Sequence, residues 1–220
     1  MADAWDAVDA YFAGALFGKD AVLDAALAAS RAGGLPDIAV APNQGMLLNV
    51  LARAVKAERI LEVGTLGGYS SIWLARALPK GGKLITLEVE KRHADVARAN
   101  FARADLAEVI EVRVGRGIDL LPKLAAENPK PFDLVFIDAD KPSNADYFDW
   151  AMKLTHKGSI IIVDNVVRGG HVADPKSTDP NVKGVHRLVE HLKAEKRVMT
   201  SALQTVGIKG YDGFTISVVV

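Results

Sequence analysis

The stretch ILEVGTLGGYSS, residues 60–71, decides the fold. It passes from a short apolar run through the glycines Gly64, Gly67 and Gly68 into a segment with helical spacing. Glycines at such a point let the backbone turn tightly and approach a ligand closely. A strand, a glycine-rich loop and a helix in this order are typical of α/β proteins that bind a ligand beyond the carboxyl ends of their strands.

The glycine loop excludes two classes of ligand site. The dinucleotide motif G-x-G-x-x-G is absent, because Thr65 and Leu66 follow Gly64 where the second glycine would stand. No Gly-Lys-Ser/Thr sequence follows, so the loop is not a phosphate-binding P-loop. Glu88 ends the next apolar run and is placed to accept hydrogen bonds from ribose hydroxyls. We therefore expect a nucleoside-like ligand without a diphosphate.

Short apolar runs alternate with helical segments from residue 59 onward. Because the runs are continuous, they indicate strands buried on both faces and a mainly parallel sheet with helices on each side. The runs are RILEV, KLITLE, IEVRV, FDLVFID and SIIIVD, and helices are expected at 70–78, 92–102, 118–127, 145–154 and 182–195. RVMTSALQTV and FTISVVV, on either side of the turn GIKGYDG, predict a final hairpin. The prediction is an α/β fold whose mostly parallel seven-stranded sheet has an antiparallel C-terminal strand.

The first forty residues are Ala-rich and have apolar positions at helical spacing. Gly33, Gly34 and Pro36 interrupt this pattern, which predicts two helices outside the main sheet. Pro42 stands at a suitable start for a third helix. No internal repeat or low-complexity linker divides the chain. We expect a single domain over 1–220, with N-terminal helices in 1–40 and the cofactor-binding and catalytic core in 41–220.

Composition narrows the function classes. Lys plus Arg equals Asp plus Glu, at 27 each, so no net charge attracts nucleic acid or an anionic membrane. The absence of cysteine excludes disulfides, thiolate metal sites and cysteine nucleophiles. No apolar run approaches the roughly 20 residues that span a bilayer, and the acidic N-terminus does not resemble a signal peptide. We expect a cytoplasmic protein without a membrane partner.

Polar and charged side chains follow two of the predicted strands. Asp138, Asp140 and Lys141 come after FDLVFI, and Asp164 and Asn165 end or follow SIIIV. The carboxyl ends of parallel strands share one edge of the sheet, so these side chains should face one crevice. An Asp at a strand end can also form a turn or cap the next helix.

Two carboxylates and an amide, from Asp138, Asp164 and Asn165, form a hard, all-oxygen ligand set. Such ligands suit Mg²⁺ best, with Mn²⁺ or Ca²⁺ possible. Three protein ligands leave positions for both oxygens of a vicinal diol on an aromatic ring. The cation would favour the ionised hydroxyl, and Lys141, three residues after Asp138, can reach the same oxygen. Lys141 is therefore the expected general base, with Asp138 beside it in the catalytic site.

Taken together, these motifs resemble the S-adenosylmethionine (SAM)-dependent, metal-dependent O-methyltransferases, a family that includes the catechol and caffeoyl-CoA enzymes. The resemblance is carried by EVG and GYS at 62–64 and 68–70, by the strand end at Glu88, and by FIDADK, DNV and DGFTISVVV. It covers about residues 36–220 in order. It implies a Rossmann-like class I methyltransferase fold, SAM as cofactor and a divalent cation.

The resemblance also implies a role for each matching residue. The amino-acid end of SAM would lie against Glu62 and Gly64, its carboxylate would bind Ser70, and its ribose would bind Glu88. Gly117 falls where the family has a small residue beside the adenine. The cofactor-binding residues implied in this way are Val40, Glu62, Gly64, Thr65, Ser70, Glu88, Gly117 and Asp138, and the metal ligands are Asp138, Asp164 and Asn165.

The leading hypothesis is methylation of a catechol-like small phenol by a homodimeric enzyme. The dimer is expected from the apolar N-terminal helices, and the resemblance to the bacterial members of the family also implies it. Three alternatives remain: a hydroxylated tRNA base as substrate, a nicotinamide oxidoreductase on a similar sheet, and a cofactor-binding protein without catalysis. The neutral charge disfavours nucleic acid. The phenol itself is not identified, and its selection should depend on the N-terminal helices and residues 166–180.

Overall fold

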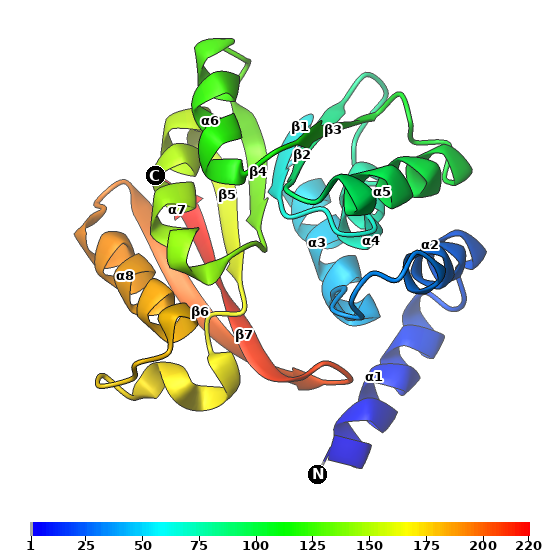
Figure 1. Cartoon of the computed structure of the whole chain (residues 1–220), viewed down its shortest axis with the longest axis horizontal. Coiled ribbons are helices and arrows are strands. Elements are labelled where there is room, and N and C mark those ends of the chain that lie inside the picture. Colours follow the sequence, from blue (N-terminus) through cyan, green and yellow to red (C-terminus); the bar gives the residue numbers. More distant parts are fainter. Residues whose placement is uncertain (1) are drawn as a thin grey trace.

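The computed structural model describes residues 2–220 and is built on one seven-stranded sheet of order β3-β2-β1-β4-β5-β7-β6 (Figure 1). Strands β1 to β5 pair in parallel, and β7 is antiparallel to both β5 and β6. The strands are β1 (Arg59–Val63), β2 (Lys83–Glu88), β3 (Ile110–Val114), β4 (Phe132–Ile137), β5 (Thr155–Asp164), β6 (Val198–Gly207) and β7 (Gly210–Val219). This confirms the predicted mostly parallel sheet with an antiparallel C-terminal strand.

Helices cover both faces of the sheet (Figure 1). Ile60 packs with α2 to α5, whereas its neighbour Leu61 packs with α6 to α8, because successive residues of a strand face opposite sides. The helices after β1 are α4 (Tyr69–Ala75), α5 (Lys91–Arg103), α6 (Gly117–Ala126), α7 (Asn144–Leu154) and α8 (Pro180–Ala194). Short 3₁₀ turns, η1 (Lys141–Ser143) and η2 (Arg168–Ala173), follow β4 and β5. The predicted helical segments all form.

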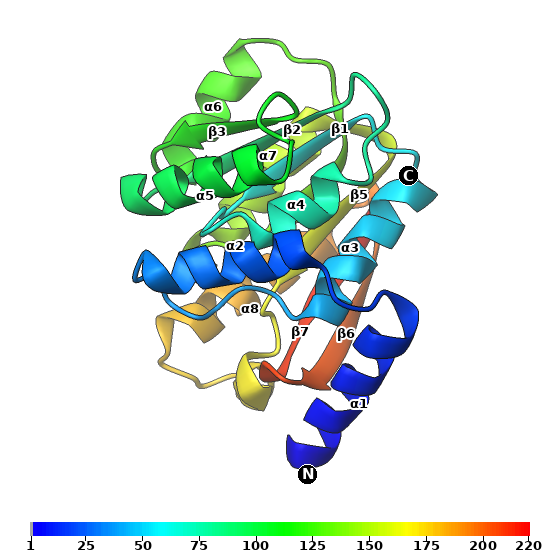
Figure 2. The same cartoon turned by 90° about the vertical axis from the view of Figure 1, so that its right-hand side faces the viewer.

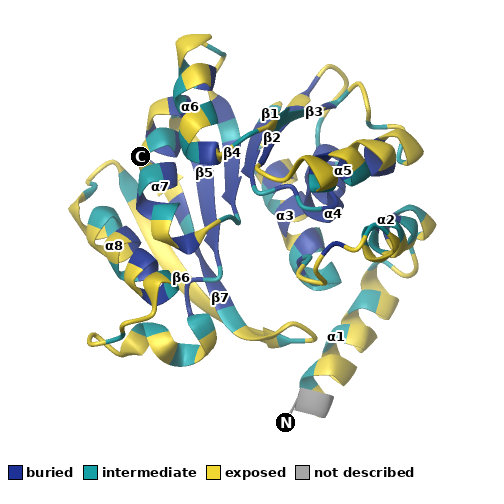
Figure 3. Cartoon of the chain, in the orientation of Figure 1, coloured by how far each residue is buried: buried dark blue, intermediate teal, exposed yellow. Residues whose placement is uncertain are grey.

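The N-terminal helices differ in how they join the core. Helices α1 (Ala2–Leu16) and α2 (Ala21–Ala32) precede α3 (Pro42–Ala54), and Pro42 begins α3 as predicted. Helix α2 lies outside the sheet, as predicted. Its Leu23 and Ala26 are buried in the core, so α2 is part of the helical layer that covers one face of the sheet. Helix α1 packs on β6 and α3 at the edge of the molecule, and it is largely exposed (Figures 2 and 3).

Two boundaries differ from the sequence prediction. The final turn comprises only Ile208 and Lys209, because Gly207 already pairs with Gly210 in the β6–β7 ladder. Gly213, expected in the turn, lies inside β7, where a Cβ atom would come within 2.1 Å of the Leu203 carbonyl oxygen. The glycine therefore serves close strand packing. Strand β5 begins earlier than predicted, at Thr155. No helix in residues 2–220 is long and apolar enough to cross a membrane.

The sheet order places the functional edge. The chain runs outward from β1 to β2 and β3 and then returns to β4 on the other side of β1. Such a reversal leaves a crevice at the carboxyl ends of the two central strands. The Asp138 N–H donates to the Val63 carbonyl at 2.8 Å, which ties the end of β4 to the end of β1.

Candidate active site

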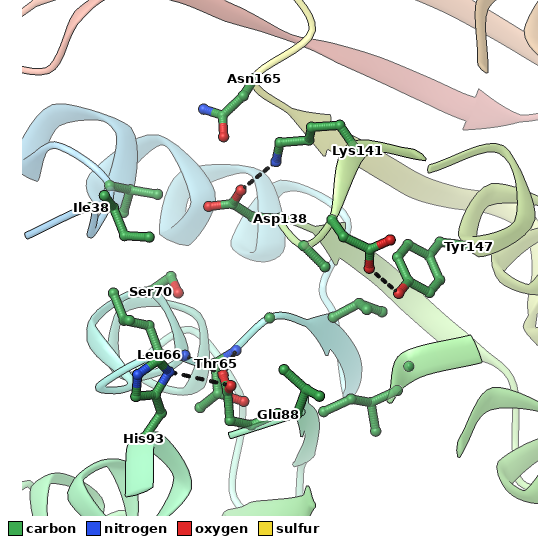
Figure 4. A pocket seen from close by; sticks show the side chains of 18 of the residues that line it. Ile38, Thr65, Leu66, Ser70, Glu88, His93, Asp138, Lys141, Tyr147 and Asn165 are labelled. Atoms are coloured by element: carbon green, nitrogen blue, oxygen red, sulfur yellow. Dashed lines mark hydrogen bonds and ion pairs between the residues drawn. The ribbon is translucent and has the colours of Figure 1, made fainter. Parts of the chain in front are cut away.

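A cavity of about 640 Å³ opens at this edge, which is within the size range of small-molecule sites. Figure 4 shows Asp138, Lys141 and Asn165 on one side of it and Ser70, Leu66 and Glu88 on the other. Most of the residues predicted from the sequence line this one cavity. They are Val40, Gly64, Thr65, Ser70, Glu88, Gly117, Asp138, Lys141 and Asn165.

The glycine loop approaches the end of β4 so closely that position 64 has no room for a side chain. Gly64 has φ +103°, and a Cβ atom there would lie 2.0 Å from the Asp138 carbonyl oxygen. Its N–H donates to the Leu87 carbonyl at 2.9 Å. Only glycine combines this backbone angle with this approach, so the loop and the Asp138 strand end form one unit.

Glu88 holds the glycine loop against β2. Its Oε2 accepts hydrogen bonds from the backbone N–H groups of Thr65, at 3.1 Å, and Leu66, at 2.7 Å. Its Oε1 accepts from the Glu90 N–H at 2.9 Å and lies 3.4 Å from His93 Nδ1. The carboxylate is buried at the cavity wall. Glu88 therefore shapes the loop in addition to any contact with a ribose.

Glu62 is fully buried and is not among the residues that line the cavity. Its carboxylate accepts hydrogen bonds from Ser70 at 2.6 Å, from Thr86 at 2.7 Å and from Ser71. Burial raises the pKa of Glu62 to about 7, although these hydroxyls oppose the shift. Ser70 does line the cavity, so any influence of Glu62 on a cofactor there would be indirect, through Ser70.

The ends of β4 and β5 bring the predicted catalytic and metal-binding residues together. Lys141 Nζ donates to Asp138 Oδ1 at 2.8 Å, and the lysine side chain is only 8% exposed (Figure 4). Asn165 has φ +57°, a left-handed conformation that asparagine tolerates better than most residues. This turn directs the chain away from β5 immediately after Asp164, while Asn165 remains at the cavity wall.

Asp164 lies behind that wall, 3% exposed, and an unpredicted partner holds it. Gln44 of α3 donates from Nε2 to Asp164 Oδ2 at 2.6 Å, and the Asn165 N–H donates to Oδ1 at 2.8 Å. Burial raises the pKa of Asp164 to about 7, and the negative charge of Asp138 adds to the shift. Two mutually repelling carboxylates at the edge of one cavity provide an environment that a cation would stabilise.

The donor set fits a hard divalent cation. Residues 2–220 contain no group of three or more His, Asp or Glu side chains placed to hold a metal, so a nitrogen-rich or carboxylate-rich centre is not formed. The available set consists of two carboxylates and one amide, from Asp138, Asp164 and Asn165. Oxygen donors of this kind suit Mg²⁺, Mn²⁺ or Ca²⁺.

Asp140 does not cap α7. The helix begins at Asn144 without a side-chain cap, and Asp140 instead accepts hydrogen bonds from Tyr147, at 2.5 Å, and from Ser143. Burial raises the pKa of the Tyr147 phenol, which keeps it a donor to Asp140. A Cβ atom at Gly117 would meet Tyr147 and Val63 at 3.0 Å, so this wall requires a very small residue.

Several residues at the cavity wall or behind it carry no recognisable signal in the sequence. Gln44, Tyr147 and Arg168 act through contacts with residues on other elements or through the shape of their loop. His93 lies on α5 beside Glu88. A carboxamide or a guanidinium in a helix or loop is usually solvated, so only the fold distinguishes these side chains from surface residues.

Comparison with known proteins identifies the family of this chain. The family model described as O-methyltransferase matches residues 21–217. The chain belongs to this O-methyltransferase family. It is 47% identical over 215 residues to a catechol O-methyltransferase of Niastella koreensis, covering 98% of this chain and 97% of the relative. It is 48% identical over 212 residues to a catechol O-methyltransferase of Mycobacterium tuberculosis, covering 96% and 94%.

Solved structures agree with this assignment. The O-methyltransferase from Bacillus cereus in complex with SAH has a TM-score of 0.98 at 50% identity, with 100% of both chains covered. The O-methyltransferase TomG from Streptomyces achromogenes, in complex with SAM, has a TM-score of 0.96 at 49% identity, covering 99% of this chain and 98% of TomG. The protein is therefore a SAM-dependent O-methyltransferase with a Rossmann-like fold. This excludes the nicotinamide oxidoreductase considered from the sequence.

Proposed function

We propose that this O-methyltransferase transfers the methyl group of SAM to one hydroxyl of a small aromatic molecule with two vicinal hydroxyls, with a divalent cation held by Asp138, Asp164 and Asn165. One observation carries the proposal: Asp138, Lys141 and Asn165 line the same cavity as the glycine loop. The catechol O-methyltransferase names of two relatives, each nearly half identical over almost the whole chain, support the choice of a vicinal diol.

The residues of the chain have distinct roles in this proposal. Bound SAM supplies an electrophilic methyl group, and a bound cation would stabilise an ionised phenol. Lys141, as the neutral amine, accepts the phenolic proton at Nζ and becomes the ammonium that pairs with Asp138. Gln44 and the Asn165 N–H fix the orientation of the Asp164 carboxylate. The buried strand ends hold the substrate oxygen in line with the methyl group, and this placement is the main catalytic contribution.

Glu88 should contribute directly to SAM affinity. Its carboxylate lies at the cavity wall and closes the β2 end, where a ribose needs an acceptor. We expect Glu88→Ala to weaken SAM binding, measured by calorimetry, by about 1.5–3 kcal/mol, the usual cost of losing a hydrogen bond to a charged group.

Glu88→Gln serves as the matched variant, because it keeps the side-chain shape and one oxygen for the Thr65 and Leu66 N–H groups. An affinity loss in both variants indicates a direct ribose contact, whereas a loss in Glu88→Ala alone indicates a role in holding the loop. Unchanged affinity in both would place the cofactor elsewhere.

The function is tested by methyl transfer from labelled SAM in the presence of Mg²⁺. The acceptors compared are catechol, a set of substituted catechols and, as an alternative, total tRNA. A reaction in buffer without any acceptor serves as the control. We expect a monomethylated catechol, identified by mass spectrometry. Labelling of tRNA with no labelled catechol would replace the proposed substrate class.

We also propose that the enzyme is a homodimer. Helix α1 exposes apolar side chains, including Tyr11 at 69% and Leu16 at 73%, and the two elements that it packs on expose Val50 of α3 and Met199 of the edge strand β6. Exposed apolar side chains on neighbouring elements favour a protein partner. Sedimentation at micromolar concentration tests the proposal, and a monomer there would contradict it.

A further inference from the structure

Arg168 is a cation in the cavity wall whose guanidinium is only partly satisfied by the protein. It lines the cavity with Asn165 and Lys141, and its side chain is 30% exposed. Its Nε is shielded from solvent and has no acceptor among the described residues. Its ion pair with Asp212 spans 3.6 Å from NH1 to Oδ2, which is too long for a good hydrogen bond. A shielded donor without an acceptor is costly, so the protein holds this guanidinium poorly, and its exposed part can still meet an anion in the cavity.

The loop that carries Arg168 is held firmly in place. Asp212 Oδ1 accepts hydrogen bonds from the N–H groups of Val167 and Arg168, both at 2.9 Å. The Val166 N–H donates to the Gly213 carbonyl at 2.9 Å. Arg168 has φ +55°, a left-handed angle that is unfavourable for a non-glycine residue and persists only when the surroundings impose it. The fold therefore fixes the backbone of Arg168 in an unfavourable conformation at the cavity wall.

The other basic residues of the wall are engaged differently. Lys141 pairs with Asp138 at 2.8 Å, and His93 lies beside Glu88. Arg116 adjoins Gly117, and its side chain is 69% exposed. Arg168 stands three residues after Asn165, so its positive charge belongs to the part of the cavity near the proposed metal ligands.

We propose that Arg168 binds a carboxylate carried by the phenolic substrate, so that the preferred substrates are catechols with an acidic side group. This inference rests on the proposed methylation of vicinal diols and names the class of diol. A guanidinium presents parallel N–H donors that match a carboxylate in two-point contact. The hydroxyls would lie at the strand ends and the acidic group at the loop after β5.

A matched substrate series tests the inference. Protocatechuate, catechol and dopamine share the vicinal diol but differ in their side group. Protocatechuate carries an anionic carboxylate, catechol has no side group, and dopamine carries a cationic amine. We expect the wild-type kcat/KM to decrease in that order. Arg168→Gln should reduce the protocatechuate-to-catechol ratio of kcat/KM by about 10- to 100-fold, as expected for lost hydrogen bonds to a charged group. Arg168→Glu should turn the preference toward dopamine. Arg116→Gln, which removes another wall cation, should leave the ratio unchanged.

A binding measurement separates this inference from the proposed function. Calorimetric titration of the SAH-loaded enzyme with protocatechuate should show binding that weakens about 10-fold or more in Arg168→Gln, whether or not methyl transfer follows. If catechols are methylated but neither the ratio nor the binding changes in Arg168→Gln, Arg168 is only a structural partner of Asp212 and the inference is wrong. If protocatechuate binds through Arg168 but no diol is methylated, the proposed reaction is wrong and the anion site stands. Equal thermal unfolding midpoints show that the variants fold.

Discussion

Removal of the divalent cation is expected to abolish methyl transfer while leaving SAM bound. Asp138, Asp164 and Asn165 lie at the carboxyl ends of β4 and β5, whereas the residues expected to hold SAM lie mainly on the glycine loop and β2. EDTA should therefore lower turnover of catechol by roughly 10³-fold or more, since Lewis-acid stabilisation is worth several kcal/mol. Calorimetry should show nearly unchanged SAM affinity.

Metal replacement and a monohydroxy substrate sharpen this test. Mg²⁺ or Mn²⁺ should restore activity, and Ca²⁺ should bind with poorer turnover because its longer, looser coordination misplaces the nucleophile. Phenol should react far more slowly than catechol because it offers the cation one oxygen instead of two. Asp164→Asn should weaken Mn²⁺ binding measured by electron paramagnetic resonance, whereas Asp140→Asn should retain it. Full activity in EDTA with equal rates on phenol and catechol would make these carboxylates structural.

Most of the fold could be predicted from the sequence because its strands are buried on both faces. Continuous apolar runs such as RILEV and KLITLE coincide with β1 and β2 residue for residue. The limits of the hairpin could not be read in this way. Gly210 and Gly213 suggest a long turn, but the ladder continues through both, and Gly213 is required by the nearby Leu203 carbonyl. Glycine in a sequence does not distinguish a turn from a close strand contact.

The candidate site shows the same division between local and long-range information. Asp138 and Asn165 could be placed together because each follows a strand and adjacent parallel strands end at one edge. Gln44 could not, because its hydrogen bond to Asp164 joins residues 120 positions apart on different elements. Glu62 illustrates a different limit: its motif position is visible, but its burial behind Ser70 depends on hydroxyls from α4 and β2. Side-chain direction therefore required the structure.

Replacement of Lys141 with alanine is expected to lower kcat by roughly 10²–10⁴-fold, the usual contribution of a general base, with a smaller effect on KM. Lys141 is buried at the cavity wall, and its Nζ is held 2.8 Å from Asp138 Oδ1, so the amine is fixed close to the proposed substrate oxygen. The loss should shrink at high pH, where the diol ionises without help. Steady-state kinetics with catechol and saturating Mg²⁺ across a pH series measure both effects.

Lys141→Arg distinguishes a base from a charge partner. Arginine keeps the positive charge that pairs with Asp138, but its guanidinium does not give up its proton in a protein and so cannot act as a base. If Lys141 removes the phenolic proton, both variants lose kcat and both recover partly at high pH. If Lys141 only neutralises Asp138, the arginine variant keeps most of its activity, and the pH dependence of the alanine variant parallels that of the wild type. Calorimetric SAM binding and thermal unfolding of both variants show whether the cavity remains formed. Retention of full kcat by a folded, SAM-binding Lys141→Arg enzyme would therefore require the base to be another group or water.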